Sequence, residues 1–242
     1  MSMHRMPQRI HAYLRGARRA LQGETRSADT PAKTHKEYAR MPRMVLPRPS
    51  PLPVSLDSAL ESRTSHFSGN KEILPRDFST LLYHALGARK DRTRRYPSAG
   101  ALYPIETYIV ALSLSGIPRA LFHYHPHAHT LEHLWDVPSD FDPRAFAPTA
   151  RGASAFLLFT AVWERTAAKY GDFGYLHAVI EAGHMAQNVL LVASALKIAA
   201  CPLGGFDEKI AASILDLDNE TEQPMYAIAL QRTASDQKER SQ

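Results

Sequence analysis

The chain has 242 residues, of which 44% are hydrophobic and 22% charged, as is ordinary for one globular domain with an appended segment. Its single cysteine, Cys201, excludes an internal disulfide framework and a cysteine-rich metal site. The net charge of +5 is uneven, because residues 1–49 hold 11 Lys/Arg against 3 Asp/Glu and the remaining residues hold 18 against 21. We therefore expect no nucleic-acid-binding face within the fold, and the lack of a continuous apolar leader or span favours a cytoplasmic protein without a membrane segment.

Residues 1–54 read as a basic, proline-rich arm. Apolar residues at helical spacing predict a short basic helix over 8–22. The prolines of segment 41–52 deny it a helix interior, which indicates an extended stretch lying on another surface. The basic charge fits either a solvated tail or a docking segment for a partner protein or an acidic peptide. We expect the compact domain to span residues 55–242.

The pattern within this domain predicts the α+β class. Helices are predicted over 55–63, 75–86, 175–199 and 207–215. Strands are predicted over 107–113, 121–125, 155–162 and 225–230. Ser55 or Asp57 suits the N-cap of the first helix, and Gly87 suits the end of the second. The long helix over 175–199 is apolar round most of its circumference, so we expect it at the centre of the fold or at a dimer interface.

Two turns of small residues stand out. The run Pro97-Ser98-Ala99-Gly100-Ala101 leads, through Tyr103-Pro104, into a predicted strand. Far downstream, Leu203-Gly204-Gly205 follows the long helix. Small residues let the backbone approach a flat ligand closely, because no large side chain stands in the way. Either turn alone is ordinary; the pair points to a binding site.

These turns, with the motif Glu181-x-Gly-His-x-x-Gln-Asn188, resemble the nitroreductase-like flavoproteins over about residues 60–230. The dipeptide Lys169-Tyr170 resembles the azoline dehydrogenase branch of that superfamily, the streptolysin- and microcin-type oxidases. The resemblance implies a nitroreductase-like fold, with an antiparallel-type central sheet flanked by helices, and a homodimer that holds FMN at the interface. The implied activity is oxidation of thiazolines or oxazolines to thiazoles or oxazoles in a ribosomally made precursor peptide, with the cyclodehydratase as a natural partner.

The resemblance also assigns roles to individual residues. The implied FMN contacts are Arg63, Ser65, Pro97, Ser98, Ala99, Ala101, Leu203, Gly204, Gly205 and Arg232. Phe67 occupies the third, basic position of the family's first signature, so the chain departs from the pattern there. Lys169 is the implied general base for the substrate Cα proton, with Tyr170 beside it. Lysine serves as a base only where burial or nearby cations lower its pKa from about 10.4.

A histidine-rich run surrounds Pro126, and two functions other than azoline oxidation are compatible with the sequence. His123 and His125 fall on one face of a predicted strand and suit chelation, but their run resembles the family's hairpin, with Pro126 at the turn. We therefore predict no metal site. An NAD(P)H-dependent nitro- or quinone reductase and a flavin-free scaffold subunit of a peptide-modifying complex both stay open. A yellow protein with bound FMN excludes the scaffold, and rapid bleaching by NADPH favours the reductase.

Overall fold

One antiparallel sheet of seven strands forms the centre of the structure, a computed structural model that describes residues 6–21, 33–65, 72–150 and 152–231. The strand order is β1-β4-β3-β2-β5-β7-β6, and every neighbouring pair is antiparallel. The strands are β1 (Arg43–Val45), β2 (Ile105–Ala111), β3 (Ala120–His125), β4 (Thr130–Asp136), β5 (Ala153–Val162), β6 (Ala199–Leu203) and β7 (Glu222–Gln231).

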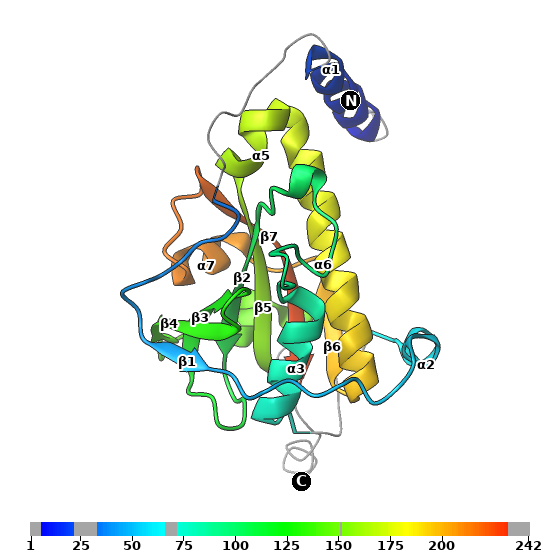
Figure 1. Cartoon of the computed structure of the whole chain (residues 1–242). Helices are drawn as coiled ribbons and strands as arrows, with labels where there is room; N and C mark the ends of the chain where they lie inside the picture. Colours follow the sequence, from blue (N-terminus) through cyan, green and yellow to red (C-terminus); the bar gives the residue numbers. More distant parts are fainter. Residues whose placement is uncertain (1–5, 22–32, 66–71, 151, 232–242) are drawn as a thin grey trace.

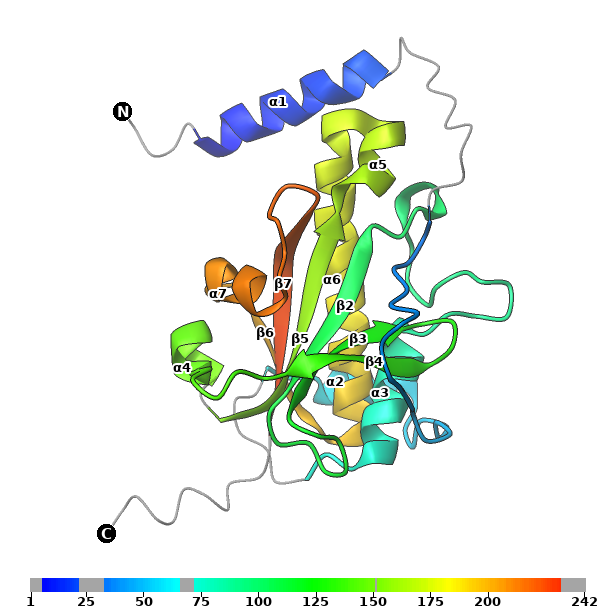
Figure 2. The ribbon, with the colours of Figure 1, turned by 90° about the vertical axis from the view of Figure 1, so that its left-hand side faces the viewer.

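Helices lie on both faces of this sheet (Figures 1 and 2). The described helices are α1 (Met6–Leu21), α2 (Leu56–Ser62), α3 (Pro75–Leu86), α4 (Pro143–Phe146), α5 (Trp163–Tyr170), α6 (Gly174–Leu196) and α7 (Glu208–Ile214), with short turns η2 (Ala99–Ala101), η3 (Pro148–Ala150) and η4 (Gly171–Phe173). Helix α1 covers neither face, because it lies beyond the end of the sheet beside η4 (Figure 2). One core cluster packs α3 and α6 against the sheet, and a second packs α4 and α7 against its other face. The prediction of an α+β fold with an antiparallel sheet between helices is confirmed.

Strand β5 and helix α6 are the two central elements. Nine of the ten residues of β5 are buried, because the strand lies between β2 and β7 and is covered on both faces. Helix α6 buries residues such as Met185 and Val189 against the sheet. Trp163–Leu196 is long and apolar enough to cross a membrane, but 56% of its most apolar window is buried in the fold, as expected of a core helix.

Helix α6 leaves one apolar stripe uncovered. Tyr175, Val179 and Ile180 remain 52%, 40% and 46% exposed near its N-terminal end. Large apolar side chains grouped on one helix face usually mark a contact surface. The single chain therefore does not bury α6 on all sides, which is relevant to the expected dimer.

The structure corrects three local predictions. The long helix ends at Leu196 instead of residue 199, because Lys197 adopts the left-handed conformation (φ 58°) and caps it. The alanines that seem to continue the helix form β6 instead, so Leu203 ends a strand and does not follow the helix directly. Helix α5 and strand β4 were not predicted at all.

The N-terminal arm contributes a strap (residues 33–41) that runs along the sheet and leads into β1 (Figure 1). The strap closes a buried polar network. The backbone N–H of Lys36 donates to Glu106, and its ammonium group pairs with Glu222. The backbone N–H of Tyr38 donates to Glu132 at 3.2 Å. Each of these carboxylates is nearly inaccessible to solvent, so the strap supplies hydrogen bonds that water cannot.

Candidate active site

The small-residue turn before β2 is strained. Gly100, Ala101 and Tyr103 all have positive φ, of 61°, 55° and 48°. The Ser98 hydroxyl accepts a hydrogen bond from the Tyr103 backbone N–H at 2.9 Å, which holds the turn closed. A non-glycine residue in the left-handed region costs on the order of 1–2 kcal/mol. Such strain concentrates at functional sites, because the surrounding structure must pay to maintain it.

Lys169 and Tyr170 lie directly against this turn. A Cβ built on Gly100 would stand 2.8 Å from the Tyr170 hydroxyl and 3.0 Å from the Lys169 ammonium nitrogen. Only glycine fits there, both for its φ and for this close approach. The two residues end helix α5, where Lys169 is exposed and the Tyr170 ring packs against His177 with 4.6 Å between centroids. The structure thus joins two motifs that are far apart in the sequence.

A buried carboxylate stands behind the turn. Glu181, on α6, is 2% exposed, and within the described part of the chain neither of its oxygens has a hydrogen-bond partner of normal geometry. Burial raises the pKa of Glu181 to about 7, although the nearby Ser98 hydroxyl and Ile105 backbone N–H oppose the rise. Perturbed carboxyl groups of this kind are enriched at active sites. The sequence identified Glu181 only as part of a motif and did not predict that its carboxyl group is buried.

The second small-residue turn lies at the end of β6. Leu203 is 2% exposed and pairs with Ala227 of β7. Gly204 and Gly205 are exposed, and a Cβ built on either would meet no atom of the described structure within 4 Å. The fold itself therefore does not require glycine at these two positions. Open space beside a backbone turn suits the approach of a flat ring.

The third group of expected contacts lies at the other end of α6. Arg63 and Ser65 follow helix α2, and the Arg63 guanidinium is 3.5 Å from the Ser65 hydroxyl. The neighbouring Ser62 hydroxyl contacts Ser194 at 2.9 Å, near the C-terminal end of α6. A half-buried arginine beside an exposed hydroxyl suits a phosphate group. Arg232, the other expected phosphate contact, lies outside the described residues.

A single chain does not bring all the expected cofactor contacts and the Lys169–Tyr170 pair together. Tyr170 packs on α6 at His177, whereas the Arg63 segment reaches α6 at Ser194. At 1.5 Å per residue these two points are roughly 25 Å apart along the helix. Among the described residues the structure thus joins Pro97–Ala101 with Lys169 and Tyr170, and it keeps Arg63 and Ser65 at a distance.

Comparisons with known proteins give a consistent result. The sequence profile of the Nitroreductase family matches residues 61–230. A Methanocaldococcus jannaschii protein described as a nitroreductase is 31% identical over 146 residues, which are 59% of this chain and 74% of that protein. The microcin B17-processing protein McbC of Escherichia coli is 28% identical over 170 residues, and the trifolitoxin-processing protein TfxB of Rhizobium leguminosarum is 26% identical over 224. These two alignments cover 66% and 84% of this chain, which spans 62% and 60% of the two processing proteins.

Solved structures share the fold. A Ralstonia eutropha protein described as a nitroreductase superposes with a TM-score of 0.68 at 22% identity, over 86% of this chain and 97% of that one. A chain of the Escherichia coli microcin synthetase McbBCD complex, solved with truncated pro-MccB17 bound, superposes with a TM-score of 0.61 at 23% identity, over 76% and 74%. An Exiguobacterium sibiricum protein described as a nitroreductase in complex with FMN gives 0.51 at 12%, over 75% and 89%.

Proposed function

Since the chain belongs to the nitroreductase family, we propose that it is an FMN-dependent dehydrogenase that oxidises thiazolines or oxazolines to thiazoles or oxazoles in a ribosomally made peptide. The observation that carries this proposal is the position of Lys169 and Tyr170 against Gly100 of the strained turn. The similarity to two peptide-processing proteins, McbC and TfxB, supports a role in peptide modification.

The reaction requires a base. Converting an azoline to an azole removes a proton from Cα and a hydride from the neighbouring carbon. Bound FMN would supply the hydride acceptor. Lys169 is the group placed to take the proton, because its ammonium nitrogen borders the small-residue turn at Gly100, beside the Tyr170 hydroxyl. Lys169 is exposed in the single chain, so the burial that a lysine base requires would come from the second copy and the bound FMN. Tyr170 lies beside it, with the Lys169 nitrogen 5.4 Å from the centre of the phenol ring, where it can orient the lysine or the substrate.

The residues present fit an FMN shared by two copies of the chain. Gly204 and Gly205 leave open space for the ring edge, while Arg63 and Ser65 offer donors for the phosphate. These donors lie far along α6 from the Lys169 group, so a second copy is needed to bring both to one ligand. The exposed stripe of Tyr175, Val179 and Ile180 supports such a dimer. The McbBCD neighbour is a complex with a truncated pro-peptide bound, which supports a peptide substrate and a partner protein. We propose the precursor peptide and the cyclodehydratase in these two roles.

The test is azole formation by the Lys169→Ala variant. We expect it to keep FMN and fold but to lose roughly 10²–10⁴-fold in rate, followed as the mass loss of two hydrogens from an azoline peptide. Tyr170→Phe is expected to cost less. Lys90→Ala, which changes an exposed lysine away from the turn, is the matched control and should be inert. Native-rate oxidation by Lys169→Ala would make the Lys-Tyr pair structural.

An NAD(P)H-dependent nitro- or quinone reductase is the second candidate. It is favoured by the 31% identity to the M. jannaschii protein described as a nitroreductase. Anaerobic mixing of the yellow protein with NADPH distinguishes the two functions, since a reductase bleaches within a turnover and an azoline dehydrogenase bleaches only with the peptide. A colourless protein that binds no FMN would leave the scaffold role.

A further inference from the structure

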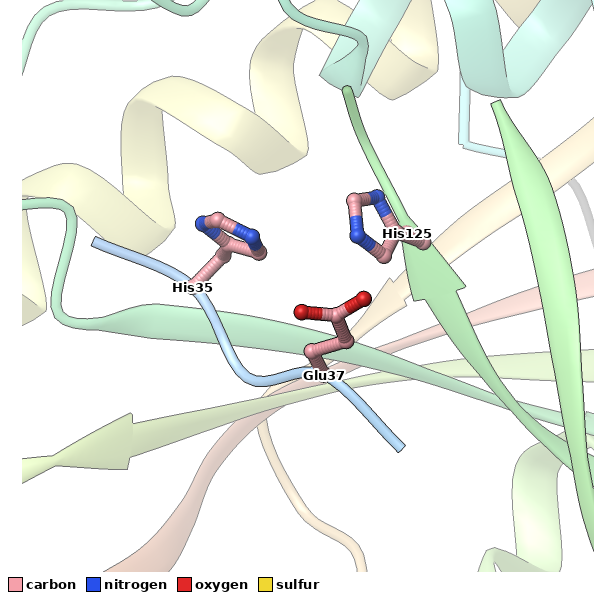
Figure 3. A group of neighbouring side chains, drawn as sticks. All are labelled: His35, Glu37 and His125. Carbon is pink, nitrogen blue, oxygen red and sulfur yellow. The ribbon is translucent and has the colours of Figure 1, made fainter. Parts of the chain in front are cut away.

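A cluster of metal-ligating side chains lies where the strap crosses the end of β3. His35 and Glu37 come from the strap and His125 from the last position of the strand, and their side chains converge (Figure 3). One ligand atom of each lies within 4.8 Å of the other two. The His127 ring packs beside them, with its centroid 4.6 Å from that of His35 and 6.1 Å from that of His125. The sequence paired His125 with His123 and predicted no metal site, whereas the structure places His125 beside two donors from a distant segment.

The donor set and its spacing suit one class of ion. Two imidazole nitrogens and one carboxylate oxygen match Zn²⁺ and related transition metals better than Mg²⁺ or Ca²⁺, which prefer oxygen alone. Bonds of about 2.0–2.2 Å in a tetrahedral site put neighbouring donor atoms roughly 3.4 Å apart. The cluster must therefore close by at most about 1.4 Å, since its donor atoms lie within 4.8 Å of one another. Glu37 can move that far, because its side chain is 51% exposed.

The nitrogens of the cluster are available. Nδ1 of His35 and Nε2 of His127 are buried and have no hydrogen-bond partner within the described part of the chain. Metal ions bind an imidazole nitrogen that carries no proton.

We propose that His35, Glu37 and His125 bind one divalent transition-metal ion of the Zn²⁺ class, which fastens the strap to the sheet. His127 is the nearest further donor. The role is structural, because the strap carries the backbone donors that satisfy Glu106 and Glu132 in the buried network. None of His35, Glu37 and His125 is among the residues proposed to contact FMN or the peptide, so this proposal does not depend on the proposed redox function.

Two existing interactions must adjust when the ion binds. The His125 Nδ1 accepts a hydrogen bond from the Ala128 backbone N–H at 3.1 Å, so in the neutral ring the proton lies on Nε2, which faces the cluster (Figure 3). Coordination at Nε2 moves that proton to Nδ1 and costs this hydrogen bond, which turns the 125–128 backbone. Arg43 donates to Oε1 of Glu37 at 2.8 Å, and the other carboxylate oxygen is the one left for the ion. One hydrogen bond is a small loss beside three coordination bonds.

The test uses the full chain, purified without a histidine tag and stripped with a chelator. Titration calorimetry with Zn²⁺ and visible absorption with Co²⁺ measure stoichiometry, affinity and coordination. We expect one ion per chain, the intense absorption of four-coordinate Co²⁺, a rise in melting temperature and a shift of the Ala128 amide resonance. Glu37→Gln and His35→Gln are each expected to weaken binding by at least about 10-fold. Because Glu37 is exposed, its variant should fold even if the His35 variant does not.

Matched controls separate this site from other histidines. His133→Gln removes a half-buried histidine of β4 that is outside the cluster, and Glu220→Gln removes an exposed carboxylate of a loop. Both should leave affinity and the Co²⁺ spectrum unchanged. Absence of stoichiometric binding would overturn the proposal. Equal weakening by Glu37→Gln and Glu220→Gln, or by His35→Gln and His133→Gln, would also overturn it, since the ions would then be bound by scattered surface groups.

Discussion

Replacing the buried Glu181 by glutamine should stabilise the protein by an amount that grows as pH rises from about 4.5 to about 7 and is largest above that range. The carboxyl group is 2% exposed, and burial raises its pKa from 4.5 to about 7. Between these two pH values the folded chain keeps the proton that the unfolded chain has lost. The free energy of unfolding must therefore fall as pH rises through this window. The difference corresponds to about 3 kcal/mol once the folded carboxyl is ionised.

Glutamine has nearly the same shape as protonated glutamate and never ionises. Glu181→Gln should therefore match the native protein near pH 4.5 and exceed it by up to about 3 kcal/mol above pH 7. Urea unfolding at pH 5 and pH 8, at one fixed protein concentration, gives both values. Glu61→Gln changes an exposed glutamate of α2 and should shift neither value. A stability difference for Glu181→Gln that is the same at both pH values would refute the reasoning.

A carboxyl group that lowers stability at this position is expected to have a functional role. Glu181 lies behind Ser98, in the turn that Lys169 and Tyr170 contact. Residues that are kept at an active site against stability commonly trade stability for activity. We therefore expect Glu181→Gln to unfold less readily above pH 7 and to form azoles more slowly. Full activity in the stabilised variant would assign Glu181 to folding alone.

The remaining predictions address other features of the fold. Gly100→Ala should destabilise the protein by about 1–2 kcal/mol in urea unfolding and disturb the base, because its φ is 61° and its Cβ would clash. Gly204→Val should abolish FMN absorbance yet leave the melting temperature within about 2 °C, since its side chain meets open space; Gly16→Val, also in open space, should keep the flavin. Ile180→Glu should convert a dimer to a monomer by light scattering, and an unchanged dimer would exclude this stripe. Burial lowers the pKa of His123, but its two carboxylate partners outweigh burial and raise the pKa overall. The stability that protonated His123 confers should therefore be complete below about pH 6.5 and decline as pH rises further.

The sequence predicted best where a pattern repeats along one element. Helical spacing predicted α3 and its end at Gly87, and a continuous apolar run predicted β5. It failed at α6, because Ala199 and Ala200 continue an apolar run while the helix is ended by Lys197 in a left-handed conformation. A lysine gives no signal for that conformation, whereas glycine would.

Elements that depend on distant partners escaped prediction for a different reason. Strand β4 mixes polar and apolar residues without a regular alternation, and the strap and His123 satisfy its buried Glu132. Helix α5 is short and largely polar, so neither its period nor its length separates it from a loop. The resemblance nonetheless singles out Lys169, because it reports the dipeptide and not the helix that carries it.

The candidate site gathers the features that local rules count as unfavourable. Three residues in the turn before β2 have positive φ, and a carboxylate without a normal hydrogen bond is buried behind them. The two non-glycine residues among them and the buried carboxylate each cost on the order of 1–3 kcal/mol, which a globular domain sustains only where the rest of its sequence is locally consistent. The buried strand β5 and the apolar face of α6 supply that consistency directly beneath the turn. The sequence therefore predicts the strand and helix beneath the turn reliably. It does not predict the strained turn or the buried carboxyl group, because distant residues hold both of these in place.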